Sequence, residues 1–447
     1  RRHRPDDPSE VAAEVLQIER NMDIAAGLGF TSYLLFQEEA FPKLLTWGGR
    51  HKPDETLRKA VHEVLDHATA RGLKLYLHCN EFMWPKEVGV SYGDTEQAWA
   101  TYRNALKELI LLYPEIAGFQ VTADETSGAL ESKEGVLKFH NETARALNSD
   151  GRDRLALMRT WQRVGDFMGP VSTLAEGDQP NVIFSIKNTS GDFQLTKGLD
   201  ADFIGEVKAA DRLLVEFDAW REYETHNIFP VYLADYWAPR FQQLHRTGVQ
   251  RVGVRFNWNS GKFPITERPW ANWVNVFTFT RLAENPDVAP DDILREFVGL
   301  YFPADSREAA FAIYKNSFNY VKTLYYANGE KVTDHGRVNR ARKIGDKSVP
   351  KDWLTQVDGQ LEQMVELIRN LPPEGAYRSE LERGAKAIAY MSKVVGLQLG
   401  APGDRGLIRE WREYDPASYE ELRGDNADQV AERNRDLNPS APRIESA

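Results

Sequence analysis

The chain opens with two contrasting hydrophobic patterns. From Pro8 to Gly29, apolar residues recur at helical spacing, which predicts a helix with one buried face that ends at the glycines. The residues on that face are Val11, Val15, Ile18, Met22 and Ala25. The next run, Thr31 to Gln37, is short and rich in β-branched and aromatic residues, which is typical of a strand.

This alternation of helix and strand continues to residue 258. Further helices are predicted over Leu57–Ala70, Thr95–Leu112, Gly135–Leu147 and Val231–Thr247. Further strands are predicted over Leu73–His78, from Ile116 onward, and over Leu155–Trp161, Asn181–Asn188, Arg212–Ala219 and Arg251–Trp258. Short apolar strands that alternate with helices indicate a parallel α/β fold. We count seven such strands. A closed (β/α)8 TIM barrel has eight, so we expect the first strand to lie upstream of this sequence or to be missing from it.

From Trp270 onward the pattern predicts helices only. The predicted helices are Trp270–Leu282, Pro290–Tyr301, Ser306–Ala327, Trp353–Leu371 and Tyr377–Leu399. We therefore expect a TIM-barrel catalytic domain over residues 1–265 and an all-α C-terminal domain over residues 266–447. The last stretch, Arg423–Ala447, is polar and charged, and we expect a surface tail there.

Composition and charge narrow the class of partner. The formal net charge of −11 argues against nucleic acid or an anionic membrane, because both attract basic proteins. No glycine-rich phosphate loop follows any predicted strand, which argues against a nucleotide. The 11 Trp, 17 Tyr and 21 Phe could stack on sugar rings, although a large core uses the same residues. A neutral or sugar-like substrate fits this composition best.

The cysteine content sets a further limit. The single cysteine, Cys79, excludes an intrachain disulfide and a multi-cysteine metal site. It does not decide between a cytoplasmic, periplasmic or secreted protein. His78, Cys79 and Glu81 mix metal-ligand types, but adjacent strand residues point to opposite faces, so we expect no metal site there.

Polar residues follow the predicted strands. The clearest case is the apolar strand from Ile116, which runs directly into Asp124 and Glu125. In a parallel barrel the carboxyl ends of the strands converge on one mouth. The residues that would meet there are Glu38, Asn80, Glu125, Arg159, Asp192, Glu222 and Asn257. Several carboxylates beside an arginine suit glycoside cleavage, which needs one protonated carboxyl group and one ionised carboxylate.

Three of these residues also have structural interpretations. Arg159 could neutralise buried carboxylates as an ion pair. Asp192 follows a Thr-Ser-Gly turn and could cap a helix. Glu222 could form a salt bridge at the rim with Arg221 or its neighbours.

Several segments occur in a recognisable order. Gly118–Glu125, Ala156–Arg159, Ile186–Gln194 and Arg221–Tyr223 follow one another in an order that resembles the α-glucuronidases of glycoside hydrolase family 67. Gly253–Trp258, Ala271–Trp273 and Phe279–Ala283 resemble the last strand of that family and the entry to its helical domain. The Lys-Asn-x-x-x-Asp-Phe-Gln motif that begins at Lys187 is the most specific of these segments.

The resemblance implies an inverting hydrolase that removes terminal α-linked glucuronic acid, or its 4-O-methyl ether, from xylan fragments. Carried over to this chain, Asp192 and Glu222 bind or activate the water, and Glu125 is the general acid. Arg159 matches the arginine that binds the uronate carboxylate. The remaining residues that we assign to substrate binding are Asn80, Lys187, Glu38, Asn257 and Trp258.

The chain departs from the family pattern in two places. Thr122 stands where the family has a lysine that shares the uronate carboxylate, and the general acid is displaced by one position, so Asp124 is the alternative acid to Glu125. A related hydrolase of another terminal sugar and a non-catalytic sugar-binding barrel are therefore alternatives. Inverting glycosidases need no metal, and we expect no cofactor. The resemblance also implies that a homodimer can form through the helical domain.

Overall fold

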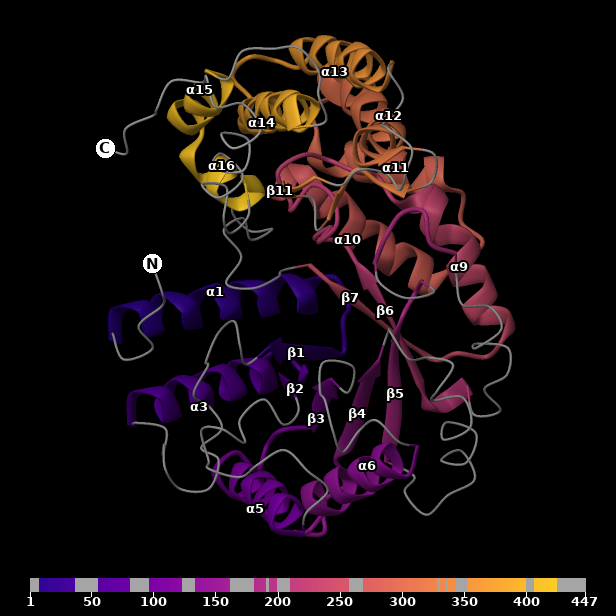
Figure 1. Cartoon of the computed structure of the whole chain (residues 1–447). Helices are drawn as coiled ribbons and strands as arrows, with labels where there is room; N and C mark the ends of the chain where they lie inside the picture. Colours follow the sequence, from indigo (N-terminus) through magenta and orange to yellow (C-terminus); the bar gives the residue numbers. More distant parts are fainter. Residues whose placement is uncertain are drawn as a thin grey trace, which may run out of the picture.

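A computed structural model of the chain describes residues 8–36, 55–80, 96–122, 133–160, 181–189, 193–198, 210–256, 268–327, 330–334, 337–341, 352–398 and 406–423. Its centre is a parallel sheet of seven strands in sequential order (Figure 1). The strands are β1 (Ser32–Phe36), β2 (Lys74–Asn80), β3 (Gly118–Thr122), β4 (Leu155–Thr160), β5 (Val182–Lys187), β6 (Leu213–Asp218) and β7 (Arg251–Arg255). All seven predicted strands are confirmed, as is the curled α/β arrangement of a TIM-like barrel.

Helices connect most of these strands and cover the outer face of the sheet. They are α1 (Pro8–Gly27), α3 (Glu55–Ala70), α5 (Glu96–Leu112), α6 (Lys133–Leu147) and α9 (Ala234–Arg246). The predicted stop of the first helix is confirmed, since α1 ends at Gly27 and Gly29 has a φ of 83°, a left-handed conformation that glycine adopts without steric cost.

Strand alternation divides the side chains between two environments. In β6, Leu213, Val215 and Phe217 join the large hydrophobic core beneath the helices. Leu214 faces the opposite way, so Glu216 and Asp218 share its inward face. The same alternation in the other strands gives the interior an apolar layer that includes Tyr76, Leu157 and Ile183, with polar residues nearer the carboxyl ends.

Gly118 makes the apolar layer possible. A Cβ atom at this position would lie 2.2 Å from the Leu155 carbonyl oxygen and 2.8 Å from the Tyr76 ring. Only glycine therefore lets the Tyr76 ring lie across β3. The ring closes the lower part of the sheet interior and leaves the carboxyl ends of the strands for polar groups.

The C-terminal part consists mainly of helices, in orange and yellow in Figure 1. They are α10 (Pro269–Glu284), α11 (Pro290–Tyr301), α12 (Arg307–Tyr325), α13 (Trp353–Arg369), α14 (Ala376–Gln398), α15 (Leu407–Tyr414) and α16 (Pro416–Arg423). Their buried side chains belong to the same hydrophobic cluster as the outer face of the sheet. None of the described helices is both long and apolar enough to cross a membrane.

The expectation of helices only after Trp270 is wrong in one respect. Two short antiparallel ladders follow α12, formed by β8 (Tyr326–Ala327) with β9 (Glu330–Lys331) and by β10 (Thr333–Asp334) with β11 (Arg337–Ala341). Three of these four strands have only two residues, which is too short to show an alternating pattern in the sequence. The first ladder contains Tyr326, whose hydroxyl contacts Glu224 after β6 and the backbone of Leu195.

One half-buried carboxyl group joins two helices of this part. Glu380 of α14 accepts the backbone N–H of Ala271 in the first turn of α10 at 3.0 Å. Burial raises the pKa of Glu380 to about 7, and the backbone donors of Ala271 and Trp270 offset only part of that rise.

Candidate active site

The inward face of the sheet carries a charged network at the ends of β3 to β6. Glu216 of β6 accepts hydrogen bonds from Gln120 Nε2 at 3.0 Å and from Arg159 Nε at 2.8 Å. The Ser185 hydroxyl on β5 also donates to Glu216. Gln120 Nε2 in turn lies 3.1 Å from the Ser185 hydroxyl. One carboxylate thus binds side chains from three neighbouring strands.

This network keeps Glu216 ionised. Burial by itself raises the pKa of Glu216, but the Arg159 charge and the Ser185 hydrogen bond outweigh it, so the pKa lies below its ordinary value. Burial and the same Arg159 charge hold the pKa of His78 well below its ordinary range. His78 is therefore a neutral imidazole, and Glu216 is a fixed negative charge beneath the mouth.

A second ion pair lies nearer the strand ends. Asp218, the last residue of β6, binds Arg255, the last residue of β7, with 3.1 Å between Oδ2 and Nη2. The two residues are also register partners in the sheet. Burial alone raises the pKa of Asp218, but the guanidinium groups of Arg255 and Arg221 lower it below the ordinary value. Asp218 is thus an anion, and its carboxylate is an acceptor with a fixed direction.

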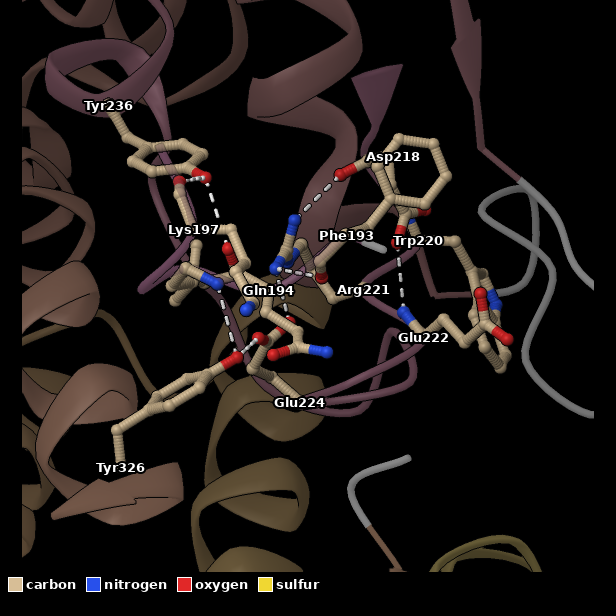
Figure 2. Close-up of polar contacts among 12 residues, drawn as sticks. Phe193, Gln194, Lys197, Asp218, Trp220, Arg221, Glu222, Glu224, Tyr236 and Tyr326 are labelled. Atoms are coloured by element: carbon tan, nitrogen blue, oxygen red, sulfur yellow. Dashed lines mark hydrogen bonds and ion pairs between the residues drawn. The ribbon is translucent and has the colours of Figure 1, made fainter. Parts of the chain in front are cut away.

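Asp218 and Arg255 together hold Glu222. The backbone N–H of Glu222 donates to Asp218 Oδ2 at 2.9 Å, and the N–H of Trp220 donates to Oδ1 at 3.1 Å (Figure 2). Arg255 Nη2 lies 2.8 Å from Glu222 Oε2. The backbone and the carboxylate of Glu222 are therefore both tied to the carboxyl ends of the strands. Its side chain is 10% exposed and is held in a defined direction.

Phe193 brings two cations of the mouth together. The Lys187 Nζ lies 4.6 Å from the centre of the Phe193 ring, and the Arg255 guanidinium carbon lies 4.9 Å from the same ring. Both are cation–π distances. Lys187 is buried at the end of β5, and its register partner is Glu216. Lys187 therefore lies on the inward face of the sheet, and the substrate-binding role expected for it stays a prediction.

The loop that carries Glu222 is unusual. Residues 219–233, here called the β6–α9 loop, are all buried, although connections normally run over the surface. Arg221, His226 and Asn227 have positive φ angles of 68°, 48° and 57°. Such conformations cost side-chain-bearing residues free energy, and they gather at functional sites where the surroundings hold them in place.

The C-terminal helices provide those surroundings. His226 Nδ1 lies 2.8 Å from Glu421 of α16, and its ring packs at a tilt against Trp220, with 4.8 Å between the ring centroids. A Cβ atom on Gly384 of α14 would lie 2.2 Å from the Ile228 carbonyl oxygen, so the helix backbone rests directly on the loop. Further on, Ser317 accepts the N–H of Tyr232 at 2.9 Å, and Asn275 accepts the N–H of Leu233 at 3.0 Å.

The structure describes some of the predicted site residues and not others. Arg159, Lys187 and Glu222 lie at the mouth, and Arg159 makes the buried ion pair that the sequence offered as an alternative. Glu222 pairs with Arg255 and not with its neighbour Arg221, whose partner is Glu224. Asn80 ends β2 beside Thr122, and only its backbone is described. The residues outside the described part are Glu38, Asp124, Glu125, Asp192, Asn257 and Trp258.

Sequence reasoning missed Glu216, Asp218 and Arg255. The signal was present, because Leu214, Glu216 and Asp218 alternate with Val215 and Phe217 in an otherwise apolar strand. A charged residue at alternate positions of a buried strand must face a polar interior or a partner. Among the described residues, no group of three or more His, Cys, Asp or Glu side chains could hold a metal ion.

Comparisons with known proteins show which solved structures have a similar fold. No family profile and no curated protein sequence matches this chain. Among solved structures it resembles a GH138 enzyme targeting pectin rhamnogalacturonan II, with a TM-score of 0.62 and 12% identity over 90% of this chain. It also resembles CpGH84D, with a TM-score of 0.51 and 13% identity over 91% of this chain, and a mutant O-GlcNAc hydrolase of Thermobaculum terrenum, with a TM-score of 0.50 and 10% identity over 96%.

These comparisons give the chain a glycoside hydrolase-like fold. They do not single out family 67. The chain spans 56% of the GH138 enzyme, 66% of CpGH84D and 95% of the O-GlcNAc hydrolase. At such low identity the likeness concerns the fold alone, so the chemistry has to be argued from the site.

Proposed function

We propose that the protein is an exo-acting glycoside hydrolase that removes terminal α-linked glucuronic acid, or its 4-O-methyl ether, from xylan-type oligosaccharides by inversion. The observation that carries the proposal is the position of Glu222. It is a carboxylate held by Asp218 and Arg255 at the carboxyl ends of the strands, where barrel enzymes carry their catalytic groups.

In this proposal Glu222 activates the attacking water. A base must be ionised and must point in a fixed direction, and the ion pair with Arg255 and the Asp218 hydrogen bond provide both conditions. Asp192 shares this role. Glu125, or Asp124 beside it, protonates the leaving oxygen. Inversion requires roughly 6.5–9.5 Å between the acid and the base, which leaves room for the water.

The cations of the mouth support a uronate substrate. Arg159 and Lys187 are buried, and the side chain of Arg255 is 7% exposed. All three lie at strand ends, beside the anions Glu216 and Asp218. We propose that Arg159 and Lys187 attract the carboxylate of the terminal sugar. Charge-assisted bonds of this kind are about twice as strong as neutral ones, so a neutral sugar would bind less well. Asn80, Glu38, Asn257 and Trp258 complete the proposed sugar contacts.

A second candidate follows from the GH138 likeness. That enzyme targets pectin rhamnogalacturonan II, and a galacturonan is built from galacturonic acid, which is also a uronate. The two uronic acids differ in the orientation of one hydroxyl group, so the same cations would serve either. Hydrolysis of a terminal galacturonate is therefore the second candidate.

We also propose that the sheet closes into an eight-stranded barrel and that residues 266–447 form the second, helical domain. In the described part β1 and β7 are the two edge strands, and the Tyr33 and Phe256 rings meet across the seam between them at 6.4 Å. An eighth strand between β7 and β1 would pair both edges.

The test uses labelled glucuronoxylan oligosaccharides and rhamnogalacturonan II fragments. Released sugar is followed by proton NMR at the anomeric position, with Glu222→Gln as the active-site variant and Glu382→Gln on the exposed face of α14 as the control. Release of β-glucuronic acid first, with activity lost by about 10²–10⁴-fold in Glu222→Gln alone, supports the proposal. Release of the α anomer first would contradict inversion. Absence of glucuronate release would overturn the substrate assignment.

A further inference from the structure

We propose that Arg221 and Glu224 are positioning residues, which set the direction of Glu222 through a buried chain of contacts that begins at Tyr326 in the C-terminal part. The inference rests on the proposed function, because Glu222 is the group whose direction matters. Nothing in the resemblance assigns a role to Glu224 or Tyr326.

The first step is the backbone at Arg221. Its φ of 68° is left-handed, a conformation that favours glycine. Arg221 directly precedes Glu222, so its backbone angles orient the peptide whose N–H donates to Asp218 at 2.9 Å. If Arg221 took an ordinary right-handed conformation, this peptide would turn and the hydrogen bond would be lost. The left-handed conformation is thus a condition for the observed direction of Glu222.

The second step is what holds Arg221 in that conformation. Its guanidinium group forms an ion pair with Glu224. It also donates to the backbone carbonyl oxygens of Asp218 at 3.2 Å and Phe193 at 3.4 Å. Figure 2 shows Arg221 at the centre of these three acceptors, which lie in the loop, at the end of β6 and in the segment 193–198. The side chain is only 2% exposed, so water cannot replace these partners.

The third step fixes Glu224 itself. Its side chain is fully buried and accepts a hydrogen bond from the Tyr326 hydroxyl. The same hydroxyl oxygen accepts the backbone N–H of Leu195 at 3.1 Å. Tyr326 begins β8, directly after α12. A residue from the C-terminal part thereby locks both the β6–α9 loop and the segment 193–198.

The directions of the side chains separate positioning from catalysis. Glu222 Oε2 lies 2.8 Å from Arg255 Nη2 at the strand ends. Figure 2 shows the Glu222 side chain pointing away from the place where Arg221 and Glu224 meet. Glu224 has no exposed surface, so substrate cannot reach it. Its effect on the reaction must pass through the loop backbone.

The experiment compares Arg221→Ala with Arg221→Gly. Both remove the guanidinium group, but only glycine accepts the left-handed angle without strain. A displacement of about 1 Å at a catalytic group can cost roughly 100-fold, so we expect kcat to fall about that much in Arg221→Ala with KM nearly unchanged. Arg221→Gly should recover at least about tenfold of this loss by the same argument. A purely structural role predicts that glycine, the more flexible residue, is no better than alanine.

Tyrosine variants supply the matched control. Tyr326→Phe removes the hydroxyl that donates to Glu224, whereas Tyr236→Phe removes a hydroxyl whose hydrogen bonds go to the carbonyl oxygens of Gln194 and Lys197 in the same segment. We expect kcat to fall in Tyr326→Phe well beyond its fall in Tyr236→Phe. Equal losses would overturn the chain of contacts.

Crystal structures of the Arg221 variants make the test independent of activity. We expect the Glu222 N–H to Asp218 hydrogen bond to be lost in Arg221→Ala and kept in Arg221→Gly. If the bond survives in both variants, positioning by Arg221 is wrong. If the structures behave as expected while the wild-type protein hydrolyses no uronide, the proposed function fails and the positioning stands.

Discussion

Arg255 joins β7 to the β6–α9 loop through a 2.8 Å ion pair with Glu222. The same guanidinium also binds Asp218 at 3.1 Å, so one buried cation neutralises two buried anions that belong to consecutive parts of the chain. Water has little access to these three side chains, so removal of Arg255 would leave both carboxylates without the neutralising charge that it supplies.

Replacement of Arg255 by Met should destabilise the protein severely. The change leaves Asp218 and Glu222 without their buried cation, and loss of one partner of a buried pair costs about 3–5 kcal/mol. The free energy of unfolding, measured by urea denaturation, should fall by this amount. The double variant Arg255→Met with Glu222→Gln should recover part of the loss. A decrease below about 1 kcal/mol in the single variant would show that water replaces the cation.

Glu216 should contribute stability that disappears in acid. Its pKa is lower in the folded protein than in the unfolded chain, so the stabilisation is present above the unfolded pKa of 4.5 and is lost as the pH falls through the folded pKa. We expect the melting temperature of the wild-type protein to drop more steeply between about pH 5 and 3 than that of Glu216→Gln. Parallel curves for the two proteins would contradict the ionised network.

Glu380 should contribute stability with the opposite dependence on pH. Its pKa is raised to about 7, so its contribution is fully present below the unfolded value of 4.5 and is lost as the pH rises through 7. The wild-type protein should lose up to roughly 3 kcal/mol of stability between about pH 5 and 8 relative to Glu380→Gln. Glu382→Gln, on the exposed side of the same helix, should follow the wild-type curve. If Glu380→Gln also follows it, the carboxyl group is not buried in solution.

Two glycines on neighbouring helices should respond oppositely to alanine. Gly384→Ala would place a methyl group 2.2 Å from the Ile228 carbonyl oxygen, and the two backbones must separate. Gly359→Ala on α13 meets no atom within 4 Å and should stabilise the helix by about 0.5–1 kcal/mol. Thermal unfolding of the two variants gives the comparison, and equal shifts would contradict the close contact of α14 with the loop. Gly384→Ala should also lower the proposed glycosidase activity, since it displaces the loop that carries Glu222.

The sequence predicted the parts of the fold that depend on local pattern. The seven strands and the main helices were predicted closely, because strands such as β5 are continuous apolar runs and helices such as α11 have clear ends at Pro290 and Tyr301. Arg159 and Glu222 were placed at the strand ends for the same reason. The eighth strand, the domain boundary and the roles of the site residues outside the described part stay predictions.

The partners of these residues could not be predicted. Glu224 and Tyr326 lie 102 positions apart, and His226 and Glu421 lie 195 positions apart. No periodicity connects such pairs, since packing alone brings them together. Likewise, the left-handed φ of Arg221 could not be predicted, because such angles are expected at glycine or asparagine and this position is an arginine.

The dependence of the β6–α9 loop on distant helices has a consequence for the growing polypeptide. Its contacts come from Asn275, Ser317, Tyr326, Gly384 and Glu421, which a ribosome adds well after the loop itself. A nascent chain that has completed the sheet still lacks the C-terminal residues that hold residues 219–233 in place. Catalytic competence should therefore arise late in translation, when α16 leaves the ribosome, and a chain released early would carry Glu222 without a defined direction.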